Sequence, residues 1–306
     1  MKTVHVIINA GAGAGHDDER ASELRAKLEA AGLDAELTLA AGGEELIAAA
    51  RRAREGGARL VVAGGGDGSV NAVASQLVDT DADGVPGHGI RFGVLPMGTL
   101  NHFAKDLGIP LELDAAIANL VSGVPVRVDV GQVNQRIFLN NSSLGLYPDI
   151  VRDREKQQRR LGRGKWLAFC WASVAALRRY PFLSLRLHVH GDEHARRTPF
   201  VFIGNNTYTM QGLNIGERAR LDEGHLSLYV AQRPTRFGLV RLACHALAGQ
   251  LAEARDFDVV LADELTIDTR RKLVRVATDG EVTLMAPPLE YRSRPGALTV
   301  IVPGAD

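Results

Sequence analysis

Residues 60–71 constrain the fold of this chain more than any other stretch. A short run rich in β-branched residues, Leu60–Ala63, is typical of a buried strand, and it stops at a cluster of glycines. A helical pattern from Val70 to Leu77 follows Ser69. A strand, a glycine-rich turn and a helix start leave backbone N–H groups pointing outward, where the helix dipole favours an anion. Because glycine has no Cβ, a phosphate can approach this backbone closely, so the stretch predicts a phosphate-binding turn.

The same alternation of strand and helix patterns runs through the first 125 residues. It predicts a parallel sheet with helices on both faces. After Pro125 the strand candidates follow one another closely, which is typical of an antiparallel sandwich. We therefore expect an α/β nucleotide-binding domain over residues 1–125 and a β-rich sandwich domain over residues 126–289. Helices expected within the second domain span residues 166–179 and 236–253.

Two further glycine-containing turns follow strands of the first domain. One spans residues 9–15 and does not complete a dinucleotide-binding fingerprint, because His16 stands where a glycine is needed. The other spans residues 96–104, where Thr99 and Asn101 could simply cap a helix. Since the carboxyl ends of parallel strands meet at one edge of a sheet, three such turns would converge on one ligand. Asp67, at the centre of the phosphate-binding turn, points to a Mg²⁺ ion or a polar network beside it.

Composition narrows the class of protein further. Lys plus Arg and Asp plus Glu number 36 each, so no net charge favours a nucleic acid partner. Cys170 and Cys244 form no disulfide framework, which favours a reducing compartment. The first strand has no secretory signal before it, and no apolar stretch approaches the ~20 residues of a membrane span. We expect a cytoplasmic protein and leave open a peripheral contact with the inner membrane surface.

Two motifs, Gly65-Gly-Asp-Gly-Ser-Val-Asn71 and Pro96-x-Gly-Thr-x-Asn-x-Phe-Ala104, resemble those of the diacylglycerol kinase-type lipid kinases, particularly their bacterial members. The resemblance implies an NAD kinase/diacylglycerol kinase-like fold with the active site in the cleft between the domains and with residues 290–303 completing the first domain. It implies ATP and Mg²⁺ as cofactors and a diacylglycerol-like lipid as acceptor. The residues implied to hold the nucleotide are Asn9, Ala10, Gly11, Ala12, Gly13, Thr38, Gly65, Gly66, Asp67, Gly68, Ser69, Asn71, Gly98, Thr99 and Asn101.

The segment Asp279-Gly280-Glu281 matches the catalytic motif of that family. Taken alone, Asp-Gly between two runs of alternating apolar residues is a β-hairpin turn signal, and such a turn can present a carboxylate to a cleft. Phosphoryl transfer to an alcohol needs a base for the hydroxyl proton. The resemblance assigns this role to the motif, and we expect Glu281 to be the base. Asp279 is the second candidate, as base or as hydrogen-bonded support.

A second acidic turn, residues 220–225, resembles the loop in which the family holds a structural Mg²⁺. The resemblance implies the Glu223 carboxylate and the carbonyl oxygens of Arg220 and His225 as ligands. Glu223 stands where the family usually has Asp, so the cage could be distorted or empty. The alternative is an acidic surface turn.

Residues 152–180 combine basic side chains with Trp, Leu and Phe, a mixture that suits the surface of an anionic membrane. The alternative is a solvated basic helix followed by a buried helix. We expect the lipid substrate to be met at a membrane surface through this segment. A homodimer is left open.

Three other functions stay open at this point. An NAD kinase shares the Gly-Gly-Asp-Gly turn, but the downstream Asn-Glu motif of that family is missing. A Rossmann-type dehydrogenase is disfavoured by His16. A lipid-binding regulatory protein with a relic ATP site is consistent with Ser69, His102 and Glu223, which replace the usual Thr, Asp and Asp.

Overall fold

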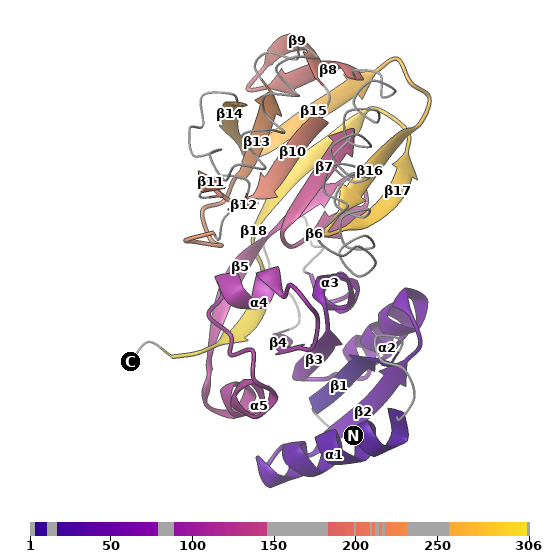
Figure 1. The fold of residues 1–306 in the computed structure, drawn as a ribbon, viewed down its shortest axis with the longest axis vertical. Coiled ribbons are helices and arrows are strands. Elements are labelled where there is room, and N and C mark those ends of the chain that lie inside the picture. Colours follow the sequence, from indigo (N-terminus) through magenta and orange to yellow (C-terminus); the bar gives the residue numbers. More distant parts are fainter. Residues whose placement is uncertain are drawn as a thin grey trace, which may run out of the picture.

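The computed structural model describes residues 4–10, 17–78, 89–145, 183–198, 200–208, 210–211, 214–215, 218–231 and 257–304. An α/β half occupies the lower part of Figure 1 and a β-rich half the upper part. The expected α/β domain with a parallel sheet, followed by a β-sandwich, is confirmed. The basic segment 152–180, both cysteines and the helices expected at 166–179 and 236–253 lie outside the described residues.

The α/β half is built on four parallel strands in the order β2-β1-β3-β4. Successive side chains of a strand point to opposite faces, so Ile8 packs with α1 and α5 while Ile7 packs with α2, α3 and α4. Helices therefore cover both faces of the sheet. The bounds are β1 Val4–Asn9, α1 Asp17–Ala30, β2 Ala35–Ala40, α2 Gly43–Glu55, β3 Leu60–Gly65, α3 Asp67–Ala74, β4 Arg91–Pro96, α4 His102–Asp106 and α5 Leu113–Ser122.

The β-rich half is a sandwich of two antiparallel layers with an apolar core between them. One layer has the order β14-β13-β10-β7-β16-β17, and the other contains β5, β6, β8, β9, β15 and the start of β18. The bounds are β5 Val124–Val133, β6 Arg136–Phe138, β7 Asn141–Gly145, β8 Leu183–Val189, β9 Asp192–Thr198, β10 Phe200–Asn205, β13 Leu226–Ala231, β14 Phe257–Ala262, β15 Glu264–Thr269, β16 Val274–Thr278, β17 Glu281–Met285 and β18 Leu289–Val302, with a short pair of β11 Met210–Gln211 and β12 Asn214–Ile215.

Strand β18 belongs to both halves. Its first residues pair antiparallel with β15 in the sandwich, and its Val300 pairs parallel with Phe92 of β4. Along its other edge it pairs with β5 in both halves, with a register shift between Arg294 and Leu298. Figure 1 shows these two strands running together from the upper half into the lower half. One ten-stranded sheet therefore extends through the part of the chain that the structure describes.

The crossing of β5 and β18 defines how the two halves meet. Pro125 lies inside β5, so the chain passes from one half to the other within a strand rather than through a linker. Residues 298–302 pack into the cores of the α/β half, whereas Tyr291 stays in the core of the sandwich. Among the described residues, no helix has the length and apolar character needed to cross a membrane.

The shared strand leads to a stability prediction. Val300 is fully buried where β4, β5 and β18 meet, so Val300→Ala should lower the free energy of unfolding by about 2–3 kcal/mol. Val124→Ala is the matched control, because Val124 lies on the neighbouring strand with 43% of its surface exposed and should cost under about 0.5 kcal/mol. Guanidinium unfolding measures both. Equal small losses would contradict the joining role of β18.

Candidate active site

The phosphate-binding turn is also the start of α3. This helix begins at Asp67, inside the glycine cluster, and not after Ser69 as the sequence pattern indicates. Its N-cap residue is Gly66, which has no side chain to bond the first N–H groups of the helix. Gly65 has a φ of +156°, and a Cβ there would lie only 2.6 Å from the Cβ of Ser69. Glycine is therefore required for the strand to turn into the helix at this point.

The turns after β1, β3 and β4 meet at one edge of the sheet. Asn9 at the end of β1 donates its side-chain N–H to the hydroxyl of Ser69, at 2.8 Å. A Cβ on Gly98 would lie 2.4 Å from the Cα of Gly66, so the backbones of these two turns touch. Asn101, with a left-handed φ of 51°, closes the last turn through two bonds with the backbone of Gly98, at 3.0 and 2.9 Å. Asn9 of the first turn and Gly98 of the third turn therefore lie beside the start of α3.

The other residues implied to hold the nucleotide lie around this edge. Thr38 shares a face of β2 with Ala40, the face against which α2 packs. Asn71 is buried on α3, and Thr99 is exposed after β4. Ala10 directly follows β1, and Gly11, Ala12 and Gly13 lie outside the described residues.

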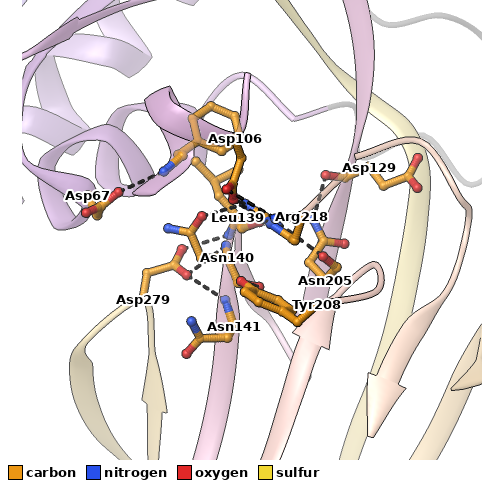
Figure 2. A network of polar contacts seen from close by, with 11 residues as sticks. Asp67, Asp106, Asp129, Leu139, Asn140, Asn141, Asn205, Tyr208, Arg218 and Asp279 are labelled. Carbon is orange, nitrogen blue, oxygen red and sulfur yellow. Dashed lines mark hydrogen bonds and ion pairs between the residues drawn. The ribbon is translucent and has the colours of Figure 1, made fainter. Parts of the chain in front are cut away.

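Asp67 connects α3 to α4. Its Oδ1 accepts a hydrogen bond from the backbone N–H of Phe103, at 3.1 Å, as Figure 2 shows. Its Oδ2 has no hydrogen-bond partner among the described residues. A carboxylate oxygen at the start of α3 is a donor that suits a Mg²⁺ ion arriving with a nucleotide.

Asp279 and Gly280 form the two-residue turn between β16 and β17. Their φ values of 47° and 87° are those of a type I′ turn, and the predicted hairpin is confirmed. The Asp279 carboxylate accepts three backbone N–H bonds, from Leu139 at 2.7 Å, Asn140 at 2.9 Å and Asn141 at 3.0 Å (Figure 2). Burial raises the pKa of Asp279 to about 6, although the three amides favour its ionised form. This carboxylate therefore anchors the hairpin to the turn before β7.

Glu281 is the carboxylate of the hairpin that faces the α/β half. A Cβ on Gly68 would lie 3.7 Å from its Oε1, so the side chain stands beside the start of α3. Its Oε2 lies 3.8 Å from Nη1 of Arg136, and about half of each side chain is exposed, so this ion pair is weak. Unlike Asp279, Glu281 is not held by backbone donors in the described part of the chain.

The loop of residues 220–225, predicted to hold Mg²⁺, has several contacts with other protein groups. The Glu223 carboxylate accepts the Thr207 N–H at 3.0 Å and lies 3.3 Å from Nε2 of His225. The carbonyl oxygen of His225 accepts the Asn206 N–H at 3.0 Å. Within the described ranges, no three side chains of His, Cys, Asp or Glu could hold a metal. The predicted ligands include two carbonyl oxygens, so Mg²⁺ binding by Arg220, Glu223 and His225 stays a prediction.

A buried polar network lies behind the hairpin, and its ion pair could not be predicted from the sequence. Asp129, with 2% of its surface exposed, accepts the N–H groups of Gly224 at 2.6 Å and Gly296 at 2.8 Å. Asp106 and Arg218 form an ion pair of 2.7 Å in the same region (Figure 2). No local pattern separates Asp106 and Arg218 from surface charges, since the two are 112 positions apart in the sequence.

The glycine-rich turn of the α/β half, joined to a sandwich that carries an acidic hairpin, defines a two-domain protein with the fold of the NAD kinases and diacylglycerol kinases. More narrowly, the chain belongs to the family of proteins with a YegS C-terminal NAD kinase beta sandwich-like domain. The diacylglycerol kinase catalytic domain matches residues 3–133, and the YegS C-terminal NAD kinase beta sandwich-like domain matches residues 149–302.

Individual relatives agree with this assignment. "Lipid kinase YegS" of Escherichia coli K12 and "Probable lipid kinase YegS" of Shigella boydii are each 31% identical over 169 residues, 54% of this chain and 54% of theirs. The match thus spans about half the length of these curated relatives. A putative diacylglycerol kinase from Bacillus anthracis has the same fold, with a TM-score of 0.75 and 21% identity over 98% of this chain and 97% of that one.

The anchoring role of Asp279 is testable by Asp279→Asn. Asn tolerates the left-handed backbone, but one acceptor oxygen becomes an N–H donor that faces amide donors. We expect a loss of about 1–3 kcal/mol in the free energy of unfolding. Glu281→Gln, on the same hairpin but exposed, should change it by under about 0.5 kcal/mol. If the two variants are equally stable, the carboxylate does not anchor the hairpin.

The contacts of Glu223 lead to a prediction about metal. Without nucleotide, replacing Mg²⁺ by EDTA should shift the melting temperature by less than about 2 °C, because the carboxylate already has protein partners. Differential scanning calorimetry measures the shift. A rise of several degrees with Mg²⁺ that Glu223→Gln abolishes would establish a metal at this loop.

Proposed function

We propose that this chain is an ATP- and Mg²⁺-dependent lipid kinase that phosphorylates the hydroxyl of a diacylglycerol-like lipid. The observation that carries the proposal is the position of Glu281, whose Oε1 would lie 3.7 Å from a Cβ on Gly68, across the junction of the two halves. Glu281 as a base beside a helix start that binds the phosphates would meet the requirements of phosphoryl transfer. Membership of the family and the printed names of the relatives support a lipid as the acceptor.

The start of α3 is the proposed site for the phosphates. Gly66 leaves the first N–H groups of the helix without a side-chain cap, and the helix dipole favours negative charge there. At Gly68 a side chain would enter the space between α3 and Glu281. The open oxygen of Asp67 would meet the Mg²⁺ ion of the nucleotide, which neutralises charge on the phosphates.

Glu281 would accept the proton of the lipid hydroxyl while the oxygen of that hydroxyl forms a bond to the γ-phosphorus. The bond from that phosphorus to the β–γ bridging oxygen breaks, and ADP leaves. The proton on Glu281 then passes to water, so that phosphorylated lipid, ADP and one proton are the products.

The lipid must come from a membrane, and contact through the basic and aromatic segment 152–180 remains a proposal from the sequence. Cosedimentation with vesicles containing anionic lipid tests that contact.

The base assignment predicts that Glu281→Gln lowers kcat by about 10²–10⁴-fold, because the amide cannot accept the proton. The melting temperature and ATP affinity should be unchanged. Glu264→Gln is the matched control. Glu264 also begins a strand, is exposed, and lies 3.8 Å from an arginine, Arg292, but far from α3. A Glu281→Gln enzyme that turns over normally would refute the assignment.

The acceptor is tested with γ-³²P-labelled ATP and extracted total lipids, with the labelled product identified by mass spectrometry. We expect label in the organic phase. Label in NADP when NAD is supplied would instead establish an NAD kinase. ATP binding without transfer to any lipid would favour a regulatory protein.

A further inference from the structure

A buried ion pair joins the two halves next to the proposed site. Asp106 is the last residue of α4 in the α/β half, and Arg218 precedes β13 in the β-rich half. Their side chains are 5% and 0% exposed, and Nη2 of Arg218 lies 2.7 Å from Oδ2 of Asp106. The Arg218 backbone N–H and Nε also donate to this carboxylate, at 3.3 and 2.8 Å. The pair therefore fixes α4 to the sandwich by several bonds at once.

Stability alone is a poor explanation for this pair. Removing two charges from water costs several kcal/mol per ion in proteins, and an apolar replacement of similar volume is often neutral or stabilising. Burial lowers the pKa of a guanidinium, but the Asp106 carboxylate beside it raises the pKa, so Arg218 stays charged. What the pair provides beyond energy is a defined geometry, because the guanidinium is a rigid planar fork.

The remaining donors of Arg218 bind the turn of residues 139–141, to which the Asp279–Glu281 hairpin is also bonded. Nη1 donates to the carbonyl oxygens of Leu139 at 2.7 Å and Asn205 at 3.1 Å, and Nη2 donates to Oδ1 of Asn140 at 2.7 Å. The same turn binds Asp279 through the N–H groups of Leu139, Asn140 and Asn141. Arg218 thus donates to carbonyl oxygens of this turn, and Asp279 accepts its N–H groups, as Figure 2 shows.

A series of contacts connects α3 to the Asp279–Glu281 hairpin across the junction of the two halves. Asp67 at the start of α3 binds the start of α4 through Phe103, and α4 ends at Asp106. Through Arg218 and the 139–141 turn the path reaches Asp279, and Glu281 follows two residues later. Oε1 of Glu281 lies beside α3, 3.7 Å from where a Cβ on Gly68 would stand.

We propose that Asp106 and Arg218 are positioning residues that set where Glu281 stands over the start of α3. Neither touches the proposed reacting atoms, so neither is a catalytic residue. This inference rests on the proposed function of Glu281, and its experiment is chosen so that the two can fail separately.

The kinetic test compares Asp106→Asn with the double variant Asp106→Leu/Arg218→Met. Asp106→Asn should lower kcat about 10²-fold with KM for ATP changed less than twofold, because a displacement of about 1 Å costs that much in transfer but not in nucleotide binding. The double variant leaves no unpaired charge, but it leaves the acceptors at Leu139, Asn140 and Asn205 without Arg218, so it should regain neither the full melting temperature nor kcat. Recovery of kcat together with stability would reduce the pair to a structural role and overturn the proposal.

A matched control is the ion pair of Arg186 and Asp268, at 2.6 Å, which joins β8 and β15 far from α3. Asp268→Asn should change neither kcat nor KM. An equal loss of kcat in this control would show that the assay responds to general destabilisation, and the positioning role would then be rejected.

Amide hydrogen exchange gives a readout that needs no activity. In the double variant, exchange at Leu139, Asn140 and Asn141 should accelerate about tenfold or more, while the amides of β3 keep their rates. If the wild type phosphorylates no lipid but these amides accelerate, the proposed function fails and the coupling of the pair to the hairpin stands. Unchanged exchange at the three amides overturns the coupling whatever the activity.

Discussion

The hydrogen-bonded strand β18 is the constraint on which the rest of the structure depends. It pairs with β15 in the sandwich and with β4 in the α/β half, and β5 follows it across both. A backbone ladder cannot slide by one residue without moving every side chain to the wrong face. The two halves are therefore held in one register, and groups contributed by different halves can face one another with little freedom.

That register matters because each half supplies one part of the proposed chemistry. The α/β half offers backbone N–H groups at the start of α3, made accessible by glycines that leave the space open. The sandwich offers carboxylates on a tight hairpin, with Asp279 bound to the 139–141 turn and Glu281 directed toward α3. The polar network of Asp106 and Arg218 lies between these parts, buried behind the hairpin. Position distinguishes the role proposed for Glu281 from that of Asp279, because only Glu281 lies beside α3.

Local physics explains which parts of this arrangement the sequence could predict. Strand and helix patterns follow from periodicity, and the turn at Asp279 and Gly280 follows from the φ values that Asp-Gly tolerates. The sequence does not predict the start of α3 at Asp67, because glycine has a low helix propensity and indicates a loop. Tertiary packing overrides that propensity here. The partners of Glu223 and Arg218 depend on tertiary contacts across 16 and 112 residues, which no local pattern encodes.

The most direct measurement of the central claim is a crystal structure with a non-hydrolysable ATP analogue and Mg²⁺. The γ-phosphate should lie against the N–H groups at the start of α3, with the Glu281 carboxylate facing it from the other half across a space wide enough for a hydroxyl group. Phosphates bound elsewhere, or a Glu281 side chain directed away from the γ-phosphate with the halves in the same register, would contradict it.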